Sequence, residues 1–275
     1  MRARKFWGWG YEDELLSDED ENNIDKRIAK TFELDSIKRI NIPTVEDIDL
    51  NESSLQHPQS LEHVLSSDKV ERLNHSYGKS FPDSARSLLG HFPSPPDYVA
   101  FPKTEEDISN ILDWASSNDI AVIPYGGGSS VCGGVETNVG HDYRGVISLD
   151  MKNLNSIIEI DKDSRTALIQ GGILGPDLES KLKEHSLTMR HYPQSFEFST
   201  LGGWIATRSG GHYATLYTHI DDFVESLKMI TPAGVYETRR LPGSGAGPSP
   251  DRFAIGSEGI MAVSYTHLRA HETES

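Results

Sequence analysis

The stretch AVIPYGGGSSVCGGV, residues 121–135, decides how the rest of this 275-residue chain is interpreted. It begins inside the apolar run Ile120–Ile123, which is typical of a buried strand. We expect Pro124 to end that strand, because proline cannot donate a ladder hydrogen bond. Three glycines, at 126–128, then allow positive φ angles and a close approach of the backbone to a ligand.

The backbone amides of this glycine loop are expected to bind an anion. Successive exposed N–H groups form a concavity suited to a diphosphate, and Ser129 and Ser130 add hydroxyl donors. A Walker A loop is excluded because no Gly-Lys-Ser/Thr follows, and a G-x-G-x-x-G pattern starting at Gly126 fails at Val131. A plain tight turn is the alternative, and three adjacent glycines alone do not decide between the two.

The composition is that of a globular protein and restricts its partners. Hydrophobic residues make up 36% and charged residues 25%, enough for a core in one large domain or two small ones. The net charge of −16 argues against nucleic acid. The sequence contains neither an apolar run of membrane-spanning length nor a secretory signal. Cys132, the only cysteine, excludes an internal disulfide, and we interpret it as a small packing residue.

The N-terminal third of the chain is interpreted segment by segment. The aromatic run FWGWGYE, from Phe6, is expected to dock on the body of the protein. The acidic run Glu12–Glu21 is interpreted as a solvated, mobile segment, and 22–50 as a short arm. Apolar spacing predicts a helix over 61–73, and 75–92 should form a polar loop and a short helix.

Local signals predict most of the remaining elements. Thr104 with Asp107 resembles a capping box, which predicts a helix that ends near Asn118. Pro176 should begin another helix. Residues 195–211 should form a ligand-facing loop leading into a short helix, and 241–251 a mobile surface loop. The predicted strands are 98–101, 145–149, the hairpin 157–160 with 167–170, and the pair 227–230 and 235–237 around a turn.

Five segments, in order, resemble the FAD-binding domain of the vanillyl-alcohol-oxidase type (PCMH-type) flavoproteins. They read PYGGGSS, GGILGPDLE, QSFEFSTLGGWIATRSGG, LKMITPAG and IGSEG. Within that group the chain is most similar to the alkyldihydroxyacetonephosphate synthases and their bacterial FAD-linked oxidase relatives, with WGWG and SFEFSTLGGW the most specific marks. The resemblance implies an α+β fold of two subdomains with FAD extended between them. The domain would cover 61–263, with 93–263 as its core, after an N-terminal arm over 1–60.

The resemblance also implies which residues hold the cofactor. Some members of the superfamily attach FAD covalently through a histidine in the glycine loop. The corresponding position in this chain is most nearly Gly128, so we expect non-covalent FAD. In the third segment, Ser195, Ser199 and Thr200 can hydrogen-bond a polar cofactor, although they could equally cap a helix. The implied cofactor-binding residues are Pro124, Tyr125, Gly126, Gly127, Gly128, Ser129, Ser130, Gln194, Ser195, Phe196, Glu197, Phe198, Ser199, Thr200, Thr207, Arg208, Ser209, Gly210, Glu258, Gly259, Ile260, Met261, Ala262 and Val263.

Three residues are candidates for catalysis: Arg208, His212 and His219. Arg208 could face substrate or flavin, or form a surface ion pair. The two histidines could exchange protons near a flavin, although such residues more often hydrogen-bond a loop. The histidines show no metal-ligand spacing with acidic partners, so we predict no metal site. Asp221 and Asp222 are expected to cap or to pair.

The family pattern breaks after Gly259. Members continue with a Gly-Val-Ile-Thr-like strand and a substrate-binding cap domain, whereas this chain gives IMAV and then SYTHLRAHETES, which lacks apolar periodicity. We interpret 264–275 as aberrant or non-native, through a frameshift, a truncated gene or foreign sequence such as an adapter. The cap domain and its catalytic Tyr and His residues would then be missing, leaving one flavin face open.

The resemblance implies the cofactor-binding half of an FAD-dependent enzyme of ether-lipid synthesis, inactive on its own. Its substrates would be acyl-dihydroxyacetone phosphate and a fatty alcohol. One alternative is a dehydrogenase or oxidase of a 2-hydroxy acid such as lactate or glycolate, and another is an inactive flavin-binding fragment. A homodimer is compatible with either enzyme. We expect a bacterial cytoplasm, or a peroxisome in a eukaryote, although no peroxisomal signal is visible.

Overall fold

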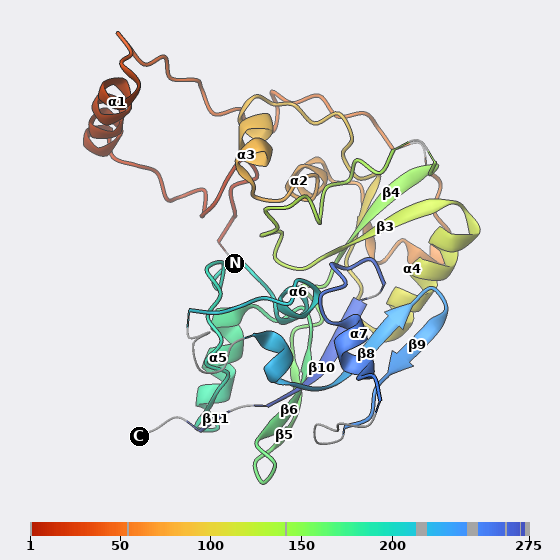
Figure 1. The fold of residues 1–275 in the computed structure, drawn as a ribbon. Coiled ribbons are helices and arrows are strands. Elements are labelled where there is room, and N and C mark those ends of the chain that lie inside the picture. The colour runs from red at the N-terminus through yellow and green to blue at the C-terminus, as the bar shows by residue number, and fades with distance from the viewer. Residues whose placement is uncertain are drawn as a thin grey trace.

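The chain folds around two β-sheets, as a computed structural model shows (Figure 1). The structure describes residues 2–53, 55–140, 142–212, 219–240, 247–261, 263–269 and 271–272, and only the backbone from 263 onward. The first sheet has four strands in the order β1-β2-β4-β3, and the second has five in the order β5-β6-β10-β8-β9. Each sheet has its own apolar cluster, which agrees with the two expected subdomains.

The first sheet is built around parallel strands. It contains β1 (Leu65–Ser66), β2 (Tyr98–Ala100), β3 (Ile120–Tyr125) and β4 (Gly145–Asp150), and β4 lies between β2 and β3, parallel to both. Helix α4 (Glu105–Ser117) connects β2 to β3 and buries Ile108 and Ile111 against the sheet. The predicted strands at 98–101 and 145–149 and the helix after Thr104 are confirmed.

Thr104→Ala should lower the free energy of unfolding by about 1 kcal/mol. The Thr104 hydroxyl accepts a hydrogen bond from the Asp107 amide, while the Asp107 carboxylate accepts one from the Thr104 amide. Urea denaturation followed by circular dichroism measures the loss. Ser109→Ala, within the same helix, is the matched control, because its hydroxyl bonds only to the Glu105 carbonyl of its own helix. Equal losses in the two variants would contradict the capping role.

Pro124 does not end its strand, contrary to the sequence prediction. β3 continues through Pro124, which pairs with Leu149, to Tyr125. The reason is that β3 is an edge strand, where a proline without an N–H can face away from the sheet. The glycine loop therefore begins one residue later, directly after Tyr125.

The second sheet is antiparallel throughout. It contains β5 (Ile157–Asp161), β6 (Thr166–Gln170), β8 (Val224–Thr231), β9 (Gly234–Glu237) and β10 (Val263–Arg269). Helices α5 (Gly175–Lys183), α6 (Leu201–Ala206) and α7 (Pro250–Ala254) contribute buried residues to its core. The predicted hairpin, the strand pair around 231–234 and the helix at Pro176 are confirmed; residues 241–246 of the predicted surface loop lie outside the described residues.

Strand β10 differs from the sequence prediction, which gave no element after 263. It lies between β6 and β8, where residue 265 is in register with Gln170 on one side and Lys228 on the other. β10 is held by main-chain hydrogen bonds to β6 and β8, and these bonds do not depend on a regular spacing of apolar side chains. The spacing of apolar residues therefore could not predict this strand. A short strand, β11 (His271–Glu272), pairs with β7 (Leu187–Thr188). The non-native origin of 264–275 stays a prediction.

The helix predicted over 61–73 is wrong. A 3-10 turn, η1 (Gln59–Leu61), precedes β1, and a separate helix α2 (Lys69–Asn74) follows it. Leu65 leaves the helical path because it pairs with Ala100, and the Asp68 carboxylate then caps the amides of Val70 and Glu71. Helix α3 (Phe81–Leu88) confirms the short helix predicted within 75–92.

The N-terminal region divides into a docked strap, residues 2–11, and a projecting helix. Phe6 packs in a third apolar cluster with Ile48 and Phe92, so the aromatic run docks as predicted. Helix α1 (Asp18–Phe32) projects away from the body and buries no residue (Figure 1). Much of the acidic segment is thus solvated as predicted, but helical, because Ser17 caps it and four acidic residues fill its first turn.

Candidate cofactor site

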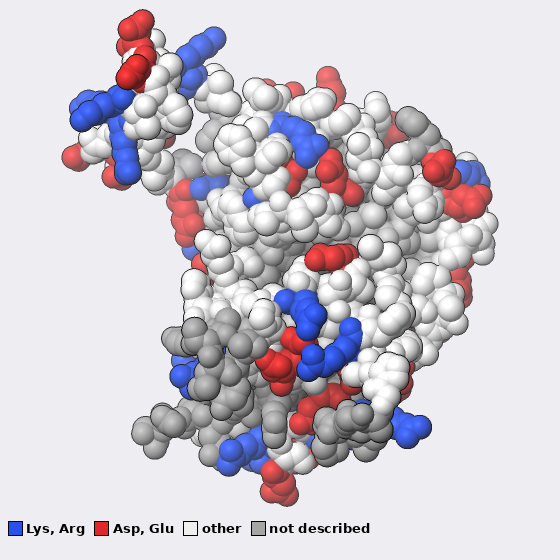
Figure 2. Space-filling view, in the orientation of Figure 1, with Lys and Arg blue, Asp and Glu red and all other residues white. Residues whose placement is uncertain are grey.

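A cavity of about 300 Å³ opens between the two sheets, over the glycine loop. On the side of the first sheet, the cavity is lined by the glycine loop. On the side of the second sheet, it is lined by the segment before α6, by α6 itself and by the turn after α7. Figure 2 shows mostly uncharged residues between the two halves on the face it presents. The predicted cofactor residues that line the cavity are Pro124, Tyr125, Gly126, Gly127, Gly128, Ser129, Ser130, Ser195, Ser199, Thr200, Thr207, Ser209, Glu258 and Gly259.

Close packing explains why the loop consists of glycines. A Cβ atom on Gly127 would lie 1.7 Å from the Phe198 carbonyl oxygen, and one on Gly126 would lie 2.3 Å from the Thr200 hydroxyl. Only Gly128 of the three has a positive φ, +68°, and its Cβ would meet the Tyr125 hydroxyl. Two of the glycines therefore let the loop pack against 198–200, and only Gly128 needs the conformational freedom that the sequence analysis gave to all three.

Two carbonyls of the loop bond to groups that lie outside the cavity. The Gly127 carbonyl accepts a hydrogen bond from Arg4 Nη1 at 2.9 Å, and the Ser130 carbonyl accepts one from the Lys79 amide at 2.6 Å. Within the described part of the chain, none of the six amides from 126 to 131 donates a hydrogen bond to a protein acceptor. This is the donor arrangement of an anion-binding concavity, and it argues against a plain tight turn.

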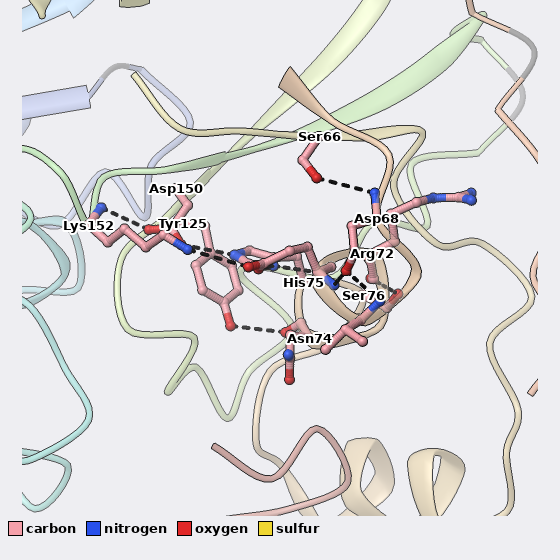
Figure 3. A network of polar contacts seen from close by, with 11 residues as sticks. Ser66, Asp68, Arg72, Asn74, His75, Ser76, Tyr125, Asp150 and Lys152 are labelled. Atoms are coloured by element: carbon pink, nitrogen blue, oxygen red, sulfur yellow. Dashed lines mark hydrogen bonds and ion pairs between the residues drawn. The ribbon is translucent and has the colours of Figure 1, made fainter. Parts of the chain in front are cut away.

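A buried polar network supports the base of the loop (Figure 3). The Tyr125 hydroxyl donates to the Asn74 carbonyl at 3.0 Å, and its ring packs 4.2 Å from that of His75. His75 joins the Glu71 carbonyl at 2.7 Å to the Asp150 carboxylate at 3.1 Å. The network links α2 to the carboxyl ends of β3 and β4, so the loop leaves its strand from a fixed position.

Two hydroxyls of the segment before α6, those of Ser199 and Thr200, have structural partners. The Thr200 hydroxyl accepts from the Gly203 amide and caps α6, which confirms the capping alternative for this residue. The Ser199 hydroxyl donates to the Ser195 carbonyl and accepts from Trp204 Nε1 at 2.7 Å. These bonds fix the wall of the cavity opposite the glycine loop.

Comparison with known proteins agrees with this geometry. Residues 96–239, just over half of the chain, match a family described as FAD binding domain. The chain belongs to this family. It is 38% identical over 199 residues to alkyldihydroxyacetonephosphate synthase of Dictyostelium discoideum, covering 72% of this chain and 32% of that protein.

Two further similarities extend the comparison. A solved structure of alkyldihydroxyacetonephosphate synthase superimposes with a TM-score of 0.84 at 29% identity, covering 98% of this chain and 54% of that one. The glycolate oxidase subunit GlcD of Bacillus subtilis is 31% identical over 210 residues, covering 73% of this chain and 44% of that one. The chain thus spans about a third of the length of the Dictyostelium relative and about half of the solved structure.

The residues of this FAD-binding domain fit an FAD diphosphate. The glycine cradle has no room for a Cβ on its packed side, and its amides are unpaired. Among the described lining residues, Glu258 is the only charged one, so backbone amides and hydroxyls would provide the contacts to the anion. No described lining residue is a histidine.

Several predicted cofactor residues lie off this cavity. Phe196 packs beside the core at 6.1 Å from the Trp204 ring, and Phe198 faces the N-terminal strap. Ile260 is 88% exposed. The other predicted residues that do not line it are Gln194, Glu197, Arg208, Gly210 and Met261; Ala262 lies outside the described residues, and only the backbone of Val263 is described.

The three catalytic candidates do not line the cavity either. Arg208 pairs with the buried Asp221 carboxylate at 2.8 Å, which matches the ion-pair alternative for Arg208 and the expected pairing of Asp221. The His212 amide donates to the Tyr192 carbonyl, and His219 caps the short turn η2 (Ile220–Asp222). Their catalytic roles stay predictions. No described group of acidic, histidine and cysteine residues could hold a metal ion, and no described helix is long and apolar enough to cross a membrane.

Sequence reasoning missed part of the lining. Cys132 is exposed and faces the cavity, so the prediction of a packing role is wrong; the close-packed loop turns it outward. Met151, Pro193 and Trp204 also line the cavity. Trp204 lies inside the motif SFEFSTLGGW, while Met151 follows β4 and Pro193 lies just before that motif, so their position beside these elements was the only signal for them.

Proposed function

We propose that this domain binds FAD non-covalently in the cavity, with the diphosphate on the glycine loop. The observation that carries the proposal is the row of six unpaired amides, in a loop whose Gly127 and Ser130 carbonyls bond to groups outside the cavity. Hydroxyls of Ser129, Ser130 and Thr207 would add contacts along the cofactor. The absence of a histidine among the described lining residues favours non-covalent binding.

In this arrangement the cofactor and the protein would have different roles. FAD, when bound, supplies electron-transfer chemistry that ordinary side chains cannot provide. The chain's own residues would bind and orient it: the loop would fix the diphosphate, and the wall formed by Ser199 and Trp204 would exclude water from one side.

FAD should stabilise the purified chain by about 2.7 kcal/mol at one hundred times its dissociation constant. Thermal unfolding with and without FAD measures this effect, and riboflavin, which lacks the diphosphate, is the matched control. The flavin should leave the protein fully when it is denatured and desalted. A chain that neither shifts its unfolding temperature with FAD nor retains flavin would refute the binding proposal, and flavin that stays attached would refute the non-covalent mode.

For the wider reaction, we favour the cofactor-binding part of an enzyme like alkyldihydroxyacetonephosphate synthase, which would act on acyl-dihydroxyacetone phosphate and a fatty alcohol. The 38% identity and the TM-score of 0.84 support this choice. The likeness to a glycolate oxidase subunit supports a 2-hydroxy-acid dehydrogenase or oxidase as second candidate. Anaerobic addition of glycolate or D-lactate to a full-length, FAD-loaded version of the protein distinguishes them: bleaching of the flavin favours the second. A full-length version that keeps FAD but converts neither substrate class would support the inactive flavin-binding alternative.

A further inference from the structure

The N-terminal strap, residues 2–11, lies across the outer side of the glycine loop. Arg4 contacts the loop through its bond to the Gly127 carbonyl, and its guanidinium lies 5.3 Å from the centre of the Phe198 ring. Trp9 and Tyr11 pack on the same ring. The strap therefore touches both segments whose close approach forms the cradle.

Peptide geometry gives this contact a consequence inside the cavity. The Gly127 carbonyl and the Gly128 amide belong to one planar, trans peptide unit, so they point in opposite directions. Arg4 lines a second cavity of about 220 Å³ on the strap side and does not line the cofactor cavity. With its carbonyl held on the strap side, this peptide must aim the Gly128 N–H toward the cofactor cavity.

Lys79 repeats the arrangement at the other end of the loop. Its amide holds the Ser130 carbonyl, which leaves the Val131 N–H facing the opposite way. Its ammonium group donates to the Lys5 and Phe6 carbonyls at 3.0 and 3.2 Å, and Trp9 Nε1 donates to the Lys79 carbonyl. Burial, with the nearby Arg4 charge, lowers the pKa of Lys79 to about 8. The strap thus reaches the loop at two points, one direct and one through Lys79.

We infer that Arg4 is a positioning residue for the cofactor: it orients the Gly128 amide toward the diphosphate, and the strap acts as an external clamp on the glycine loop. This inference rests on the proposed FAD binding. It assigns a binding role to a residue distant in sequence from the loop, whose side chain contacts the back of the loop and not the cavity. Without the guanidinium, the peptide could rotate and lose one charge-facing hydrogen bond, an effect of about tenfold in affinity.

The test compares Arg4→Met with Arg2→Met in the full chain. Methionine keeps a long stem against the Phe198 ring but removes the donor. Arg2 is the matched control because it also lies in the strap and over an aromatic ring, Tyr11, but pairs with the surface carboxylates of Asp13 and Glu14. Affinities for FAD and for ADP are measured by titration, together with the thermal unfolding of the ligand-free proteins.

We expect Arg4→Met to weaken both ligands about tenfold at an unchanged unfolding temperature, Arg4→Lys to recover part of the loss, and Arg2→Met to bind like the parent. Gly78→Ala should also weaken binding, because its Cβ would lie 2.2 Å from the Ser130 carbonyl oxygen. Unchanged affinities in Arg4→Met, or equal losses in both arginine variants, would overturn the inference. If the parent binds ADP but not FAD, and Arg4→Met weakens ADP binding about tenfold, the role of Arg4 is supported and the proposed cofactor is wrong. If the parent binds neither ligand, the role of Arg4 and the proposed FAD binding are both wrong.

Discussion

Gly127→Ala is expected to weaken FAD binding by more than about 100-fold. The added Cβ would lie 1.7 Å from the Phe198 carbonyl oxygen, closer than any real contact. The Cβ is fixed to the loop backbone and the oxygen belongs to the backbone of Phe198, so no side-chain rotation can relieve the clash. The loop must move by more than 1 Å, and displacements of that size cost about two orders of magnitude where several contacts must align. The shift would also pull the Gly127 carbonyl from Arg4.

Fluorescence titration with FAD measures this loss, and Gly8→Ala is its control. A Cβ on Gly8 meets no atom within 4 Å, and its φ is not positive, so this strap variant should bind FAD like the parent. A Gly127→Ala protein that binds FAD within a factor of three of the parent would show that the loop relaxes without cost and that its packing against 198–200 does not set the cradle.

Local patterns were enough to predict those elements whose signals are also local. The capping box at Thr104, the turn at 231–234 and the proline at 176 each fix a backbone conformation through neighbours in sequence, and each prediction is confirmed. The helix over 61–73 failed because a long-range strand pair, Leu65 with Ala100, competes with helical spacing. The prediction that Pro124 ends its strand failed for a similar reason. Only the order of strands in the sheet shows that β3 is an edge strand, where a proline is tolerated.

The candidate site shows the same limit. The glycine loop was predictable as an anion-binding backbone, but the partner that requires Gly127 is the Phe198 carbonyl, 71 residues further along the chain. The contribution of Arg4 was not predictable, because it depends on a hydrogen bond across 123 residues. A sequence motif records that a backbone must approach something closely, and the fold decides what it approaches.

Acidification should selectively destabilise the second sheet's core through His191. This side chain is 2% exposed, packs between Trp204 and Phe223, and has a hydrogen bond to the Ser209 hydroxyl at 2.9 Å. Burial, aided by the charge of His219, lowers the pKa of His191 to about 4 from an ordinary value of 6.5. Below pH 6.5 the unfolded chain therefore binds a proton that the folded chain does not.

The stability contributed by neutral His191 is therefore full above pH 6.5 and declines as the pH falls toward 4, where the folded state also takes up the proton. The loss from this one residue is about 3 kcal/mol, because each tenfold difference in proton affinity corresponds to about 1.4 kcal/mol. Other groups also titrate in this range, so the measured quantity is the difference in unfolding free energy between the parent and His191→Phe at pH 7 and pH 4.5.

Phenylalanine keeps the aromatic packing, and the half-buried Ser209 can turn to water, so the variant should fold at pH 7. Its free energy of unfolding should fall less between the two pH values than that of the parent. Parallel curves would mean that His191 is protonated inside the fold without cost.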